Sequence, residues 1–480
     1  MGQKTSNYER FLNYQKFTFI TKSIKFLYPI KIADQFRPNP IYRNFFSLKS
    51  VFKIYKNIQS FLFNIIQSLF LEDKNKIKKS DVLIISHFLS PKQANMKGDF
   101  YFGNLASFLK KKNISCCKLF INHTNFHSNY LNKNLKISNS YILEKNCDLF
   151  TELEIFYLQI KEMLRIILFY RNISSNKSFF FSVIYSLFEY ETRFAIRMYF
   201  LLKKYLKNIN PKFVIFTHEG YPWERLSIKS IKEFNKDIVC VGYQSSVLLD
   251  KDSQINKKLN GDYNPDMIWT SGTFSERVLK NSKKLKKIKV FNVGFFNKKK
   301  FKKEKRRKLK QCLVLPVGIY SECEMLLKFS LKCAKLNNNL NFIWRLHPII
   351  NKNNLSKSMK IDFKKLPRNI KFSNSAFSDD AKRCSHVLYR SSSAALKAIE
   401  YGCYPLSYKY KKGNDTDILK NFKIKKYVKS HIDLSKTMNK KNVTNNYEKL
   451  AYKYYNNIYG NINFKKIFLI IKKKVAIKTY

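Results

Sequence analysis

Acidic residues and arginine are both scarce in this chain of 480 residues. Only 33 Asp and Glu oppose 92 Lys and Arg, so the formal net charge is +59, and 15 of the 92 are Arg. Such a charge is typical of proteins that bind nucleic acid, an anionic membrane or a phosphorylated substrate. Nucleic-acid readers, however, favour the forked guanidinium of Arg, and no reader motif is present. We therefore expect no specific nucleic-acid partner.

Long apolar runs and a secretory leader are also missing. The most apolar stretch, 179–188, is interrupted by Ser182 and Ser186 and is shorter than the roughly 20 residues that span a membrane. The first twelve residues include Glu9 and Arg10 in place of an apolar signal segment. The nine Cys form no Cys-x-x-Cys pair, which argues against a disulfide framework or a structural zinc site. These absences favour a cytoplasmic protein.

Two nucleotide-binding motifs are absent as well. No Gly-x-x-x-x-Gly-Lys-Ser/Thr sequence occurs, so a P-loop NTPase is disfavoured. The loop 86–90, after the first expected strand, lacks Gly-x-Gly-x-x-Gly, which disfavours an epimerase or dehydrogenase with a single Rossmann domain. Hydrophobic residues still make up 45% of the chain. That content is enough for folded cores, and the length favours two domains.

Short apolar runs alternate with helical stretches from residue 81 onward. The nearly continuous apolar run 81–86 is typical of a buried parallel strand. With the helical stretch 99–112 and a strand at 117–122 it predicts a βαβ unit. Long aromatic-rich helices follow within 151–208. Further strands are predicted at 213–216, 238–242 and 267–269, and a helix at 223–234.

The alternation starts again after a basic stretch, 298–310, which we interpret as a linker. The fold class is therefore α/β, with two Rossmann-like domains that face each other across a cleft. We divide the chain into a helical, basic extension (1–76), a first domain (77–297), the linker, a second domain (311–460) and a basic amphipathic tail (461–480). The second domain has predicted strands at 312–317, 341–346, 370–372, 386–389 and 404–408, and predicted helices at 321–336, 378–384 and 392–401.

The two ends of the chain combine Lys with apolar residues. Between Val51 and Leu69 apolar residues recur at helical spacing. We favour a helix packed on the first domain there over a helix on a membrane surface. The tail carries the apolar run Ile467–Ile471 between Lys clusters, which fits either a last packed helix or a basic membrane contact.

The loop Thr217–Arg225 directly follows a predicted strand, and parallel sheets bind ligands where their strands end. His218 and Glu219 are candidates for a general base that takes a proton from a hydroxyl. Gly220 permits the tight turn into the next helix. A structural interpretation stays open, in which Glu219 or Glu224 caps that helix and His218 is a buried hydrogen-bond donor.

A second loop is a candidate phosphate site. Arg345 and His347 flank one apolar residue at the end of a predicted strand, and Pro348 follows. Both side chains leave the same side of an extended backbone. Arg345 can hold a phosphate through two hydrogen bonds and His347 through one. The alternative is an ordinary strand end with a solvated Arg.

A third loop places hydroxyls at a turn from strand to helix. Arg390 precedes Ser391, Ser392 and Ser393 there. Free N–H groups at a helix start, together with hydroxyls, favour a phosphate, whereas ordinary capping needs only one Ser. A candidate base followed by two phosphate loops is the layout of a group-transfer enzyme that grips an activated donor. Because these protein donors can neutralise the phosphate, we expect no metal and no other cofactor.

In order and in sequence these loops resemble GT-B glycosyltransferases of bacterial surface-carbohydrate (O-antigen or capsule) biosynthesis. His218-Glu219-Gly220 is similar to the acidic motif of bacterial sialyltransferases and polysialyltransferases, His347-Pro348 to their His-Pro motif, and Ser391-Ser392-Ser393 to their Ser-Ser motif. The resemblance implies that Glu219 or His218 is the base. It also implies that the second domain holds the phosphate of a nucleotide-sugar, with a CMP-sugar favoured, and that the first domain binds a glycan or lipid-linked glycan.

A second resemblance, to O-antigen-type biosynthesis proteins, covers residues 81–408. It rests on Tyr101–Leu105, Glu219–Glu224 and Gly242–Ser245. Lys397 stands where many GT-B enzymes place a Glu for the donor ribose, and Glu400 is the candidate to replace it. The residues that we assign to the acceptor or the cleft on this basis are Gly220, Trp223, Glu224 and Gln244.

The sequence thus predicts a glycosyltransferase that acts in surface polysaccharide synthesis, peripheral on the inner face of an anionic membrane. Arg-x-His-Pro with Ser-Ser also resembles the CDP-glycerol polymerases of teichoic acid synthesis, in which a His is the base. One alternative is therefore a CDP-alditol phosphotransferase. The alternative from another class is a non-catalytic nucleic-acid-binding protein.

Overall fold

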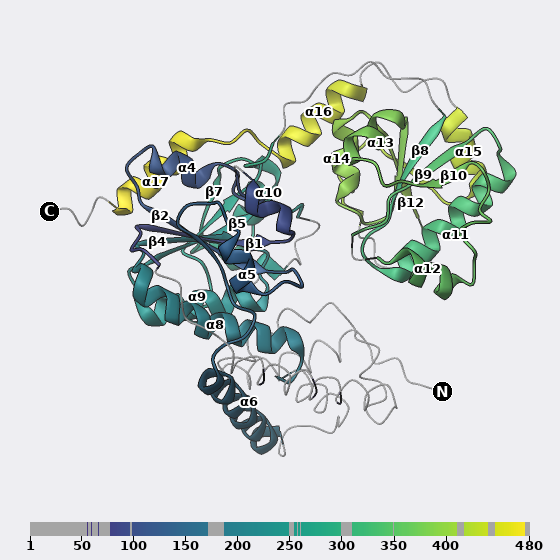
Figure 1. Ribbon diagram of the computed structural model, residues 1–480. Helices are drawn as coiled ribbons and strands as arrows, with labels where there is room; N and C mark the ends of the chain where they lie inside the picture. Colours follow the sequence, from purple (N-terminus) through teal and green to yellow (C-terminus); the bar gives the residue numbers. More distant parts are fainter. Residues whose placement is uncertain are drawn as a thin grey trace.

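The computed structural model of the chain is shown in Figure 1. It describes residues 77–475 apart from 97, 171–186, 249–253, 257, 260, 299–309, 349, 410–416 and 440–446, together with Tyr55, Gln59 and Ile66. Almost all of the predicted N-terminal extension and of the predicted linker lies outside these residues.

Seven parallel strands form the first sheet, in the order β3-β2-β1-β4-β5-β6-β7. Nearly every side chain of β1, β4 and β5 is buried, as expected for strands that are covered on both faces. Because β1 pairs with β2 on one side and with β4 on the other, the winding of the chain reverses between β1 and β4. The strands are β1 (Val82–Phe88), β2 (Cys116–Asn122), β3 (Ser140–Ile142), β4 (Phe213–Thr217), β5 (Val239–Gln244), β6 (Met267–Thr270) and β7 (Lys289–Asn292).

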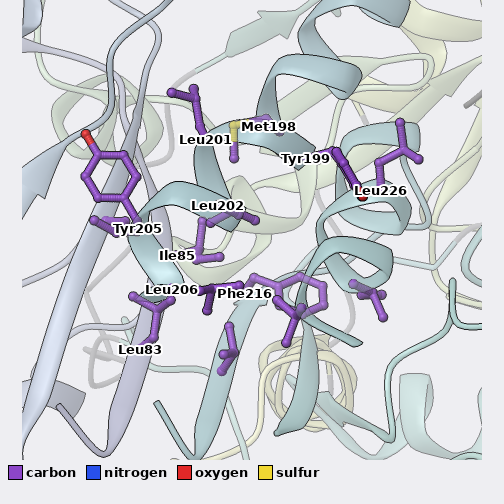
Figure 2. Packing of buried hydrophobic residues seen from close by; sticks show 14 of the residues in the cluster. Leu83, Ile85, Met198, Tyr199, Leu201, Leu202, Tyr205, Leu206, Phe216 and Leu226 are labelled. Atoms are coloured by element: carbon purple, nitrogen blue, oxygen red, sulfur yellow. The ribbon is translucent and has the colours of Figure 1, made fainter. Parts of the chain in front are cut away.

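Two helices cover one face of this sheet. Figure 2 shows α8 (Tyr190–Ile209) pressing Leu202 and Leu206 onto Leu83 and Ile85 of β1, with α9 (Pro222–Phe234) beside it. The other helices of this domain are α4 (Leu105–Lys110), α5 (Ser128–Lys133), α6 (Leu149–Tyr170) and α10 (Thr273–Lys280), with 3-10 helices η3 (Pro91–Asn95), η4 (Gln254–Asn256) and η5 (Lys283–Leu285).

The helix predicted at 99–112 is shorter in the structure, where α4 covers only Leu105–Lys110. The carboxylate of Asp99 accepts hydrogen bonds from the backbone N–H groups of Tyr101 and Phe102, at 2.7 and 2.8 Å, and from the hydroxyl of Ser86 at 2.8 Å. A side chain that binds its own backbone in this way competes with helix formation. The result is a turn that holds Tyr101 above the end of β1.

Six parallel strands form the second sheet, in the order β10-β9-β8-β11-β12-β13, and here the winding reverses between β8 and β11. The predicted α/β class with two Rossmann-like domains is confirmed. The strands are β8 (Gln311–Leu315), β9 (Asn341–Trp344), β10 (Ile370–Phe372), β11 (His386–Tyr389), β12 (Tyr404–Tyr408) and β13 (Lys426–Val428). The helices are α11 (Tyr320–Leu336), α12 (Lys352–Met359), α13 (Phe377–Arg383), α14 (Ala394–Glu400) and α15 (His431–Asn439).

The chain then returns to the first domain. Helix α16 (Tyr447–Ile458) packs against α14 of the second domain and α10 of the first (Figure 1). The N–H of Gly460 donates to the carbonyl of Ser271, past the end of β6, at 2.7 Å. A Cβ on Gly272 would meet the carbonyl of Ile458 at 2.3 Å, so this glycine permits the close approach.

The last helix, α17 (Phe464–Val475), lies beside α4 on the first domain (Figure 1). Ile467 and Ile471 are fully buried there in the apolar cluster that includes Val82 and Ile84 of β1. Within the described ranges, no helix is both long and apolar enough to cross a membrane.

Candidate functional site

Both sheets present polar side chains where their winding reverses. In the first sheet His87 is the second-to-last residue of β1, and Thr217 is the last residue of β4. In the second sheet Arg390 follows β11, at the reversal, and Arg345 follows β9, one strand away from it. Ligands of open parallel sheets bind at such a reversal, outside the carboxyl ends of the strands. The predicted site residues therefore form two groups, one on each domain.

Glu224 is fully buried beneath the loop that follows β4. Its Oε2 accepts hydrogen bonds from the backbone N–H groups of Glu219, Gly220 and Tyr221 at 2.9, 2.7 and 2.9 Å. Burial raises the pKa of Glu224 to about 8. These three bonds satisfy the N–H groups of the loop before α9, including that of its N-cap residue Tyr221. Glu224, which the sequence assigned to the acceptor or the cleft, is thus the residue that fixes the loop.

His218 is buried behind the same loop. Its Nδ1 lies 2.9 Å from Oε2 of Glu224, although the two groups do not meet at a hydrogen-bonding angle. Burial lowers the pKa of His218 well below its ordinary value, so the ring is neutral. A Cβ on Gly242 of β5 would meet the Cβ of His218 at 2.6 Å. The ring is therefore wedged between β5 and Glu224.

Glu219 differs from His218 and Glu224 because it is only partly buried. Burial raises the pKa of Glu219, while hydrogen bonds from the side chains of Ser246 and Tyr221 lower it less. Gly220 next to it has φ +87°, and a Cβ there would meet the backbone of Gln254 at 2.5 Å. Both the conformation and the space therefore require glycine, and the turn keeps the Glu219 carboxylate at the strand end.

Two histidines that we did not select from the sequence lie beside this loop. Nδ1 of His87 is 2.8 Å from Nε2 of His123, and Nε2 of His87 is 2.7 Å from Oγ1 of Thr217. Burial lowers the pKa of His87 to about 3, with a further contribution from His123. Both residues stand at the ends of strands, β1 and β2. That position is the signal that could have identified them.

Aromatic rings surround His87. The ring centroid of Tyr101 lies 5.1 Å away and that of Trp223 5.5 Å away, both edge-on. Trp223 was predicted for this region, whereas Tyr101 was noted only as part of a motif. Gln244, at the end of β5, is fully buried and donates through Nε2 to the backbone carbonyl of Ser246, the residue whose hydroxyl reaches Glu219.

The side chain of Arg345 is held by other residues of the second domain. Nη1 of Arg345 lies 2.5 Å from Oδ2 of Asp380 and 2.5 Å from the carbonyl oxygen of Ser375. Its guanidinium also lies over the ring of Phe377, 5.7 Å from the centroid. His347 is partly buried, which lowers its pKa, and Pro348 is exposed. In this loop Pro348 is thus the exposed one of the predicted residues, and Arg345 and His347 are both partly buried.

A buried carboxylate holds the serine loop. Oε2 of Glu322 accepts a short hydrogen bond from the hydroxyl of Ser391 and lies 3.7 Å from Nη1 of Arg390. Oε1 accepts from the N–H of Val317, after β8, at 3.1 Å. Glu322 therefore ties together the two loops that flank the reversal. We did not predict Glu322 from the sequence, because a Glu in the first turn of a helix such as α11 is common and indicates no particular function.

The remaining predicted residues of this group differ in exposure. Ser392 is buried, whereas Ser393 is exposed and precedes α14 without a side-chain capping bond. Glu400 is buried and accepts a hydrogen bond from the hydroxyl of Tyr455 on α16. The structure thus brings Glu400 together with α16.

The chain matches no protein-family model and no curated protein. Solved structures do match it. The glycotransferase of kitacinnamycin aligns with a TM-score of 0.50 and 8% identity, over 83% of this chain and 100% of that chain. A candidate UDP-N-acetylglucosamine 2-epimerase from Listeria monocytogenes aligns with a TM-score of 0.51 and 12% identity, over 82% of this chain and 96% of that chain. The chain has the GT-B fold.

One residue connects the two halves of this GT-B fold. Tyr459, just after α16, stacks on Phe295 with ring centroids 4.3 Å apart. Burial raises the pKa of Tyr459 to about 12, and the charges of Glu219 and Glu400 add to the rise. The charges of one carboxylate from each predicted group thus both act on Tyr459.

Candidate metal ligands are limited in the part of the chain that the structure describes. No group of three His, Cys, Asp or Glu side chains is placed there to hold an ion. The sequence has Asp-x-Asp pairs at 250–252 and 415–417, and only Asp417 is described. Its Oδ1 accepts from the hydroxyl of Tyr389 at 2.8 Å, and its Oδ2 lies 3.3 Å from Nζ of Lys425. Asp417 thus supports β11 from within the second domain.

Proposed function

We propose that the chain transfers a sugar from a nucleotide-activated donor to a hydroxyl group of a glycan or lipid-linked glycan, with Glu219 as the general base. The observation that carries this proposal is the contrast among three neighbouring groups. Glu224 and His218 are fully buried, whereas Glu219 is only partly buried at the reversal of the first sheet. A carboxylate with a raised pKa is also better matched to proton abstraction near neutral pH.

In this proposal Glu224 and His218 position the base and take no proton from substrate. Three hydrogen bonds from the backbone of 219–221 to one carboxylate restrict the direction in which the Glu219 side chain leaves the loop. His218 fills the space between Glu224 and β5, so that Glu224 cannot shift. Such support holds a reacting group within the narrow range of geometry that catalysis needs.

The acceptor would lie on the first domain, beside Trp223 and Tyr101. Both side chains offer an apolar ring face together with a polar tip, which suits the mixed surface of a sugar. The hydroxyl that attacks the donor would give its proton to Glu219. The oxygen then forms the new bond to the anomeric carbon while the bond from that carbon to the phosphate oxygen breaks.

The donor phosphate would be held by the second domain, at Ser391, Ser392, Ser393, Arg390 and His347. We assign Arg345 to holding its loop, because Asp380 and Ser375 engage its guanidinium. Hydrogen bonds and a cation aimed at the leaving phosphate stabilise the charge that develops there. We propose that these protein groups are sufficient and that no metal or other cofactor is required.

The nucleotide of the donor and the biological setting are further parts of the proposal. The sequence resemblance favours a CMP-sugar, a role in surface-carbohydrate synthesis and a peripheral position at the inner face of the membrane. The epimerase that shares the fold is named for a UDP-sugar. A thermal-shift panel of CMP, CDP, UDP and GDP separates these donors, since a ligand at 100 times its Kd stabilises a protein by about 2.7 kcal/mol.

The decisive experiment compares Glu219→Gln with Glu233→Gln, a partly exposed carboxylate away from the site. Transfer from the stabilising nucleotide-sugar is followed by nucleotide release and product mass, with and without acceptor. We expect Glu219→Gln to lower kcat by about 100-fold or more, with unchanged nucleotide binding, and Glu233→Gln to retain the wild-type rate. Wild-type kcat in Glu219→Gln contradicts the assignment of the base. A product that carries an alditol phosphate supports phosphotransfer instead.

A further inference from the structure

Helix α6 buries several polar side chains on its inner face and exposes apolar side chains on its outer face. On the side that faces α8, Glu152, Gln159 and Glu162 are buried together with Ile155 and Ile166. Glu152 binds Arg197 of α8 through two hydrogen bonds, with Nε–Oε1 at 2.6 Å and a second nitrogen to Oε2 at 2.9 Å. A surface helix ordinarily turns its apolar stripe to the core and its polar residues to water. Here the polar residues lie inside.

The outward face of α6 is apolar. Phe150 is 81% exposed, Leu168 70% and Tyr157 61%. Their spacing places them, with four more residues, on one side of the helix, in a stripe about 27 Å long. Figure 1 shows α6 at the margin of the first domain, beyond α8. The exposed apolar residues of this stripe are Phe150, Leu153, Phe156, Tyr157, Leu164, Ile167 and Leu168.

The charge around this stripe selects the kind of partner. Exposed apolar stripes of this size mark sites for another protein or a membrane. Lys161 and Arg165 flank the stripe, with Nζ of Lys161 5.8 Å from the centroid of the Tyr157 ring, and Glu154 is the exposed acid beside them. On α8, which packs against α6, Lys203, Lys204 and Lys207 are exposed. Two copies of a chain with net charge +59 repel each other, whereas anionic lipid attracts each of them.

We propose that α6 is a membrane-docking helix, which lies in the plane of an anionic bilayer with its apolar stripe among the headgroups and upper acyl chains. Long basic side chains at the edge of such a helix reach the lipid phosphates while their stems stay in apolar surroundings. The proposal is independent of the donor chemistry. It assigns the contact to a helix in the middle of the chain and to neither of its basic ends.

The test measures co-sedimentation of the full chain with vesicles of phosphatidylglycerol and phosphatidylcholine mixed, and of phosphatidylcholine alone. The variant Phe150→Ser/Leu164→Ser/Leu168→Ser removes the stripe, and Lys161→Glu/Arg165→Glu reverses its basic edge. Leu336→Ser and Leu469→Ser, on α11 and α17, are matched controls because those leucines are 58% and 56% exposed. A thermal-unfolding scan of each variant checks that the fold is retained.

We expect the wild type and both controls to bind the anionic vesicles, and the triple variant to bind at least about tenfold more weakly. The charge-reversed variant should lose its preference for anionic over neutral vesicles. Wild-type vesicle binding by a folded triple variant overturns the proposal. The proposal is equally overturned if the wild type is an oligomer in light scattering and the triple variant a monomer with unchanged vesicle binding, since a second copy is then the occupant.

Discussion

Nε2 of His87 lies 2.7 Å from Oγ1 of Thr217, and this contact joins the carboxyl ends of β1 and β4 across the reversal of the first sheet. The other ring nitrogen of His87 contacts His123 after β2, at 2.8 Å. One imidazole therefore connects the ends of the adjacent strands β2, β1 and β4, close to the loop after β4 that carries Glu219. These two contacts depend on the protonation state of His87, because a neutral imidazole donates through one nitrogen and accepts through the other.

The stability of the protein should decrease as the pH falls below about 6.5, and His87→Gln should weaken that dependence. The pKa of His87 is about 3 in the folded protein, whereas that of an ordinary histidine, as in the unfolded chain, is 6.5. Between pH 6.5 and pH 3, His87 therefore binds a proton in the unfolded chain but not in the folded protein. The stability that is present above pH 6.5 is lost as the pH falls towards 3. One such group contributes on the order of 1 kcal/mol per pH unit to the free energy of unfolding.

Urea unfolding of both proteins at several pH values between these limits measures the two slopes. His123 and His218 also have lowered pKa values, so the variant keeps part of the dependence. Equal slopes for wild type and His87→Gln contradict a His87 that is neutral in the fold. His431→Gln is the control variant, since His431 begins α15 of the second domain and lies outside this network.

Gly242→Ala should destabilise the protein and disturb the Glu219 loop at the same time. The added Cβ would lie 2.6 Å from Cβ of His218, which is wedged against Glu224 and has no space to retreat. Overpacking of this kind costs about 1–3 kcal/mol. Gly460→Ala is the matched control because its Cβ would meet no atom closer than 3.6 Å. Thermal unfolding and the transfer assay together measure both effects, and similar values for the two variants would show that the wedge is unimportant.

The two sheets could be predicted from the sequence because their central strands are buried on both faces. Val82–Ile85 and Phe213–Phe216 are continuous apolar runs, which are typical of strands buried on both faces. One edge strand, Ile370–Phe372, was predicted, whereas other strands at the sheet edges were not. Ser140–Ile142 has three residues, and Lys426–Val428 exposes Lys426 and Tyr427, so pairing with a neighbour decides their conformation.

The candidate site could be predicted only up to the strand ends. His218 and Glu219 are adjacent in sequence, and the residues around them do not indicate which of the two is buried. Gly242, on a different strand, decides it by admitting the ring of His218. The contact between His87 and His123 spans 36 positions, and that between Ser391 and Glu322 spans 69. Such pairs depend on strand order, which a single sequence does not specify.

Glu322→Gln should weaken nucleotide binding while the fold persists. The carboxylate accepts from Ser391 and from the N–H of Val317, and Arg390 lies nearby. A neutral amide keeps the shape but weakens charge-assisted bonds that are worth about 1.5–3 kcal/mol. We expect the Kd of the stabilising nucleotide to rise about tenfold. Glu324→Gln, on the same helix, removes a carboxylate that accepts from Ser358, and calorimetric titration should show no change in its Kd.

Glu219 should set the acid limb of the pH–rate profile, and its removal should stabilise the protein. The pKa of this carboxyl is raised from its ordinary 4.5, so protonation should abolish the base at a pH above that value. Below this pKa, kcat/KM falls about tenfold per pH unit. Glu219→Gln should leave a low rate that lacks this limb, and an identical limb in the variant would assign it to another group.

The stability effect has the opposite sign. A carboxyl whose folded pKa is raised contributes stability below its unfolded pKa, and this contribution is lost as the pH rises through the folded value. At neutral pH the charged Glu219 therefore destabilises the fold, and an amide at this position relieves that cost. We expect a higher Tm for Glu219→Gln than for the wild type at pH 7, with equal values near pH 4, as for a site that exchanges stability for activity. A lower Tm at pH 7 would show that Glu219 is a structural residue of the loop.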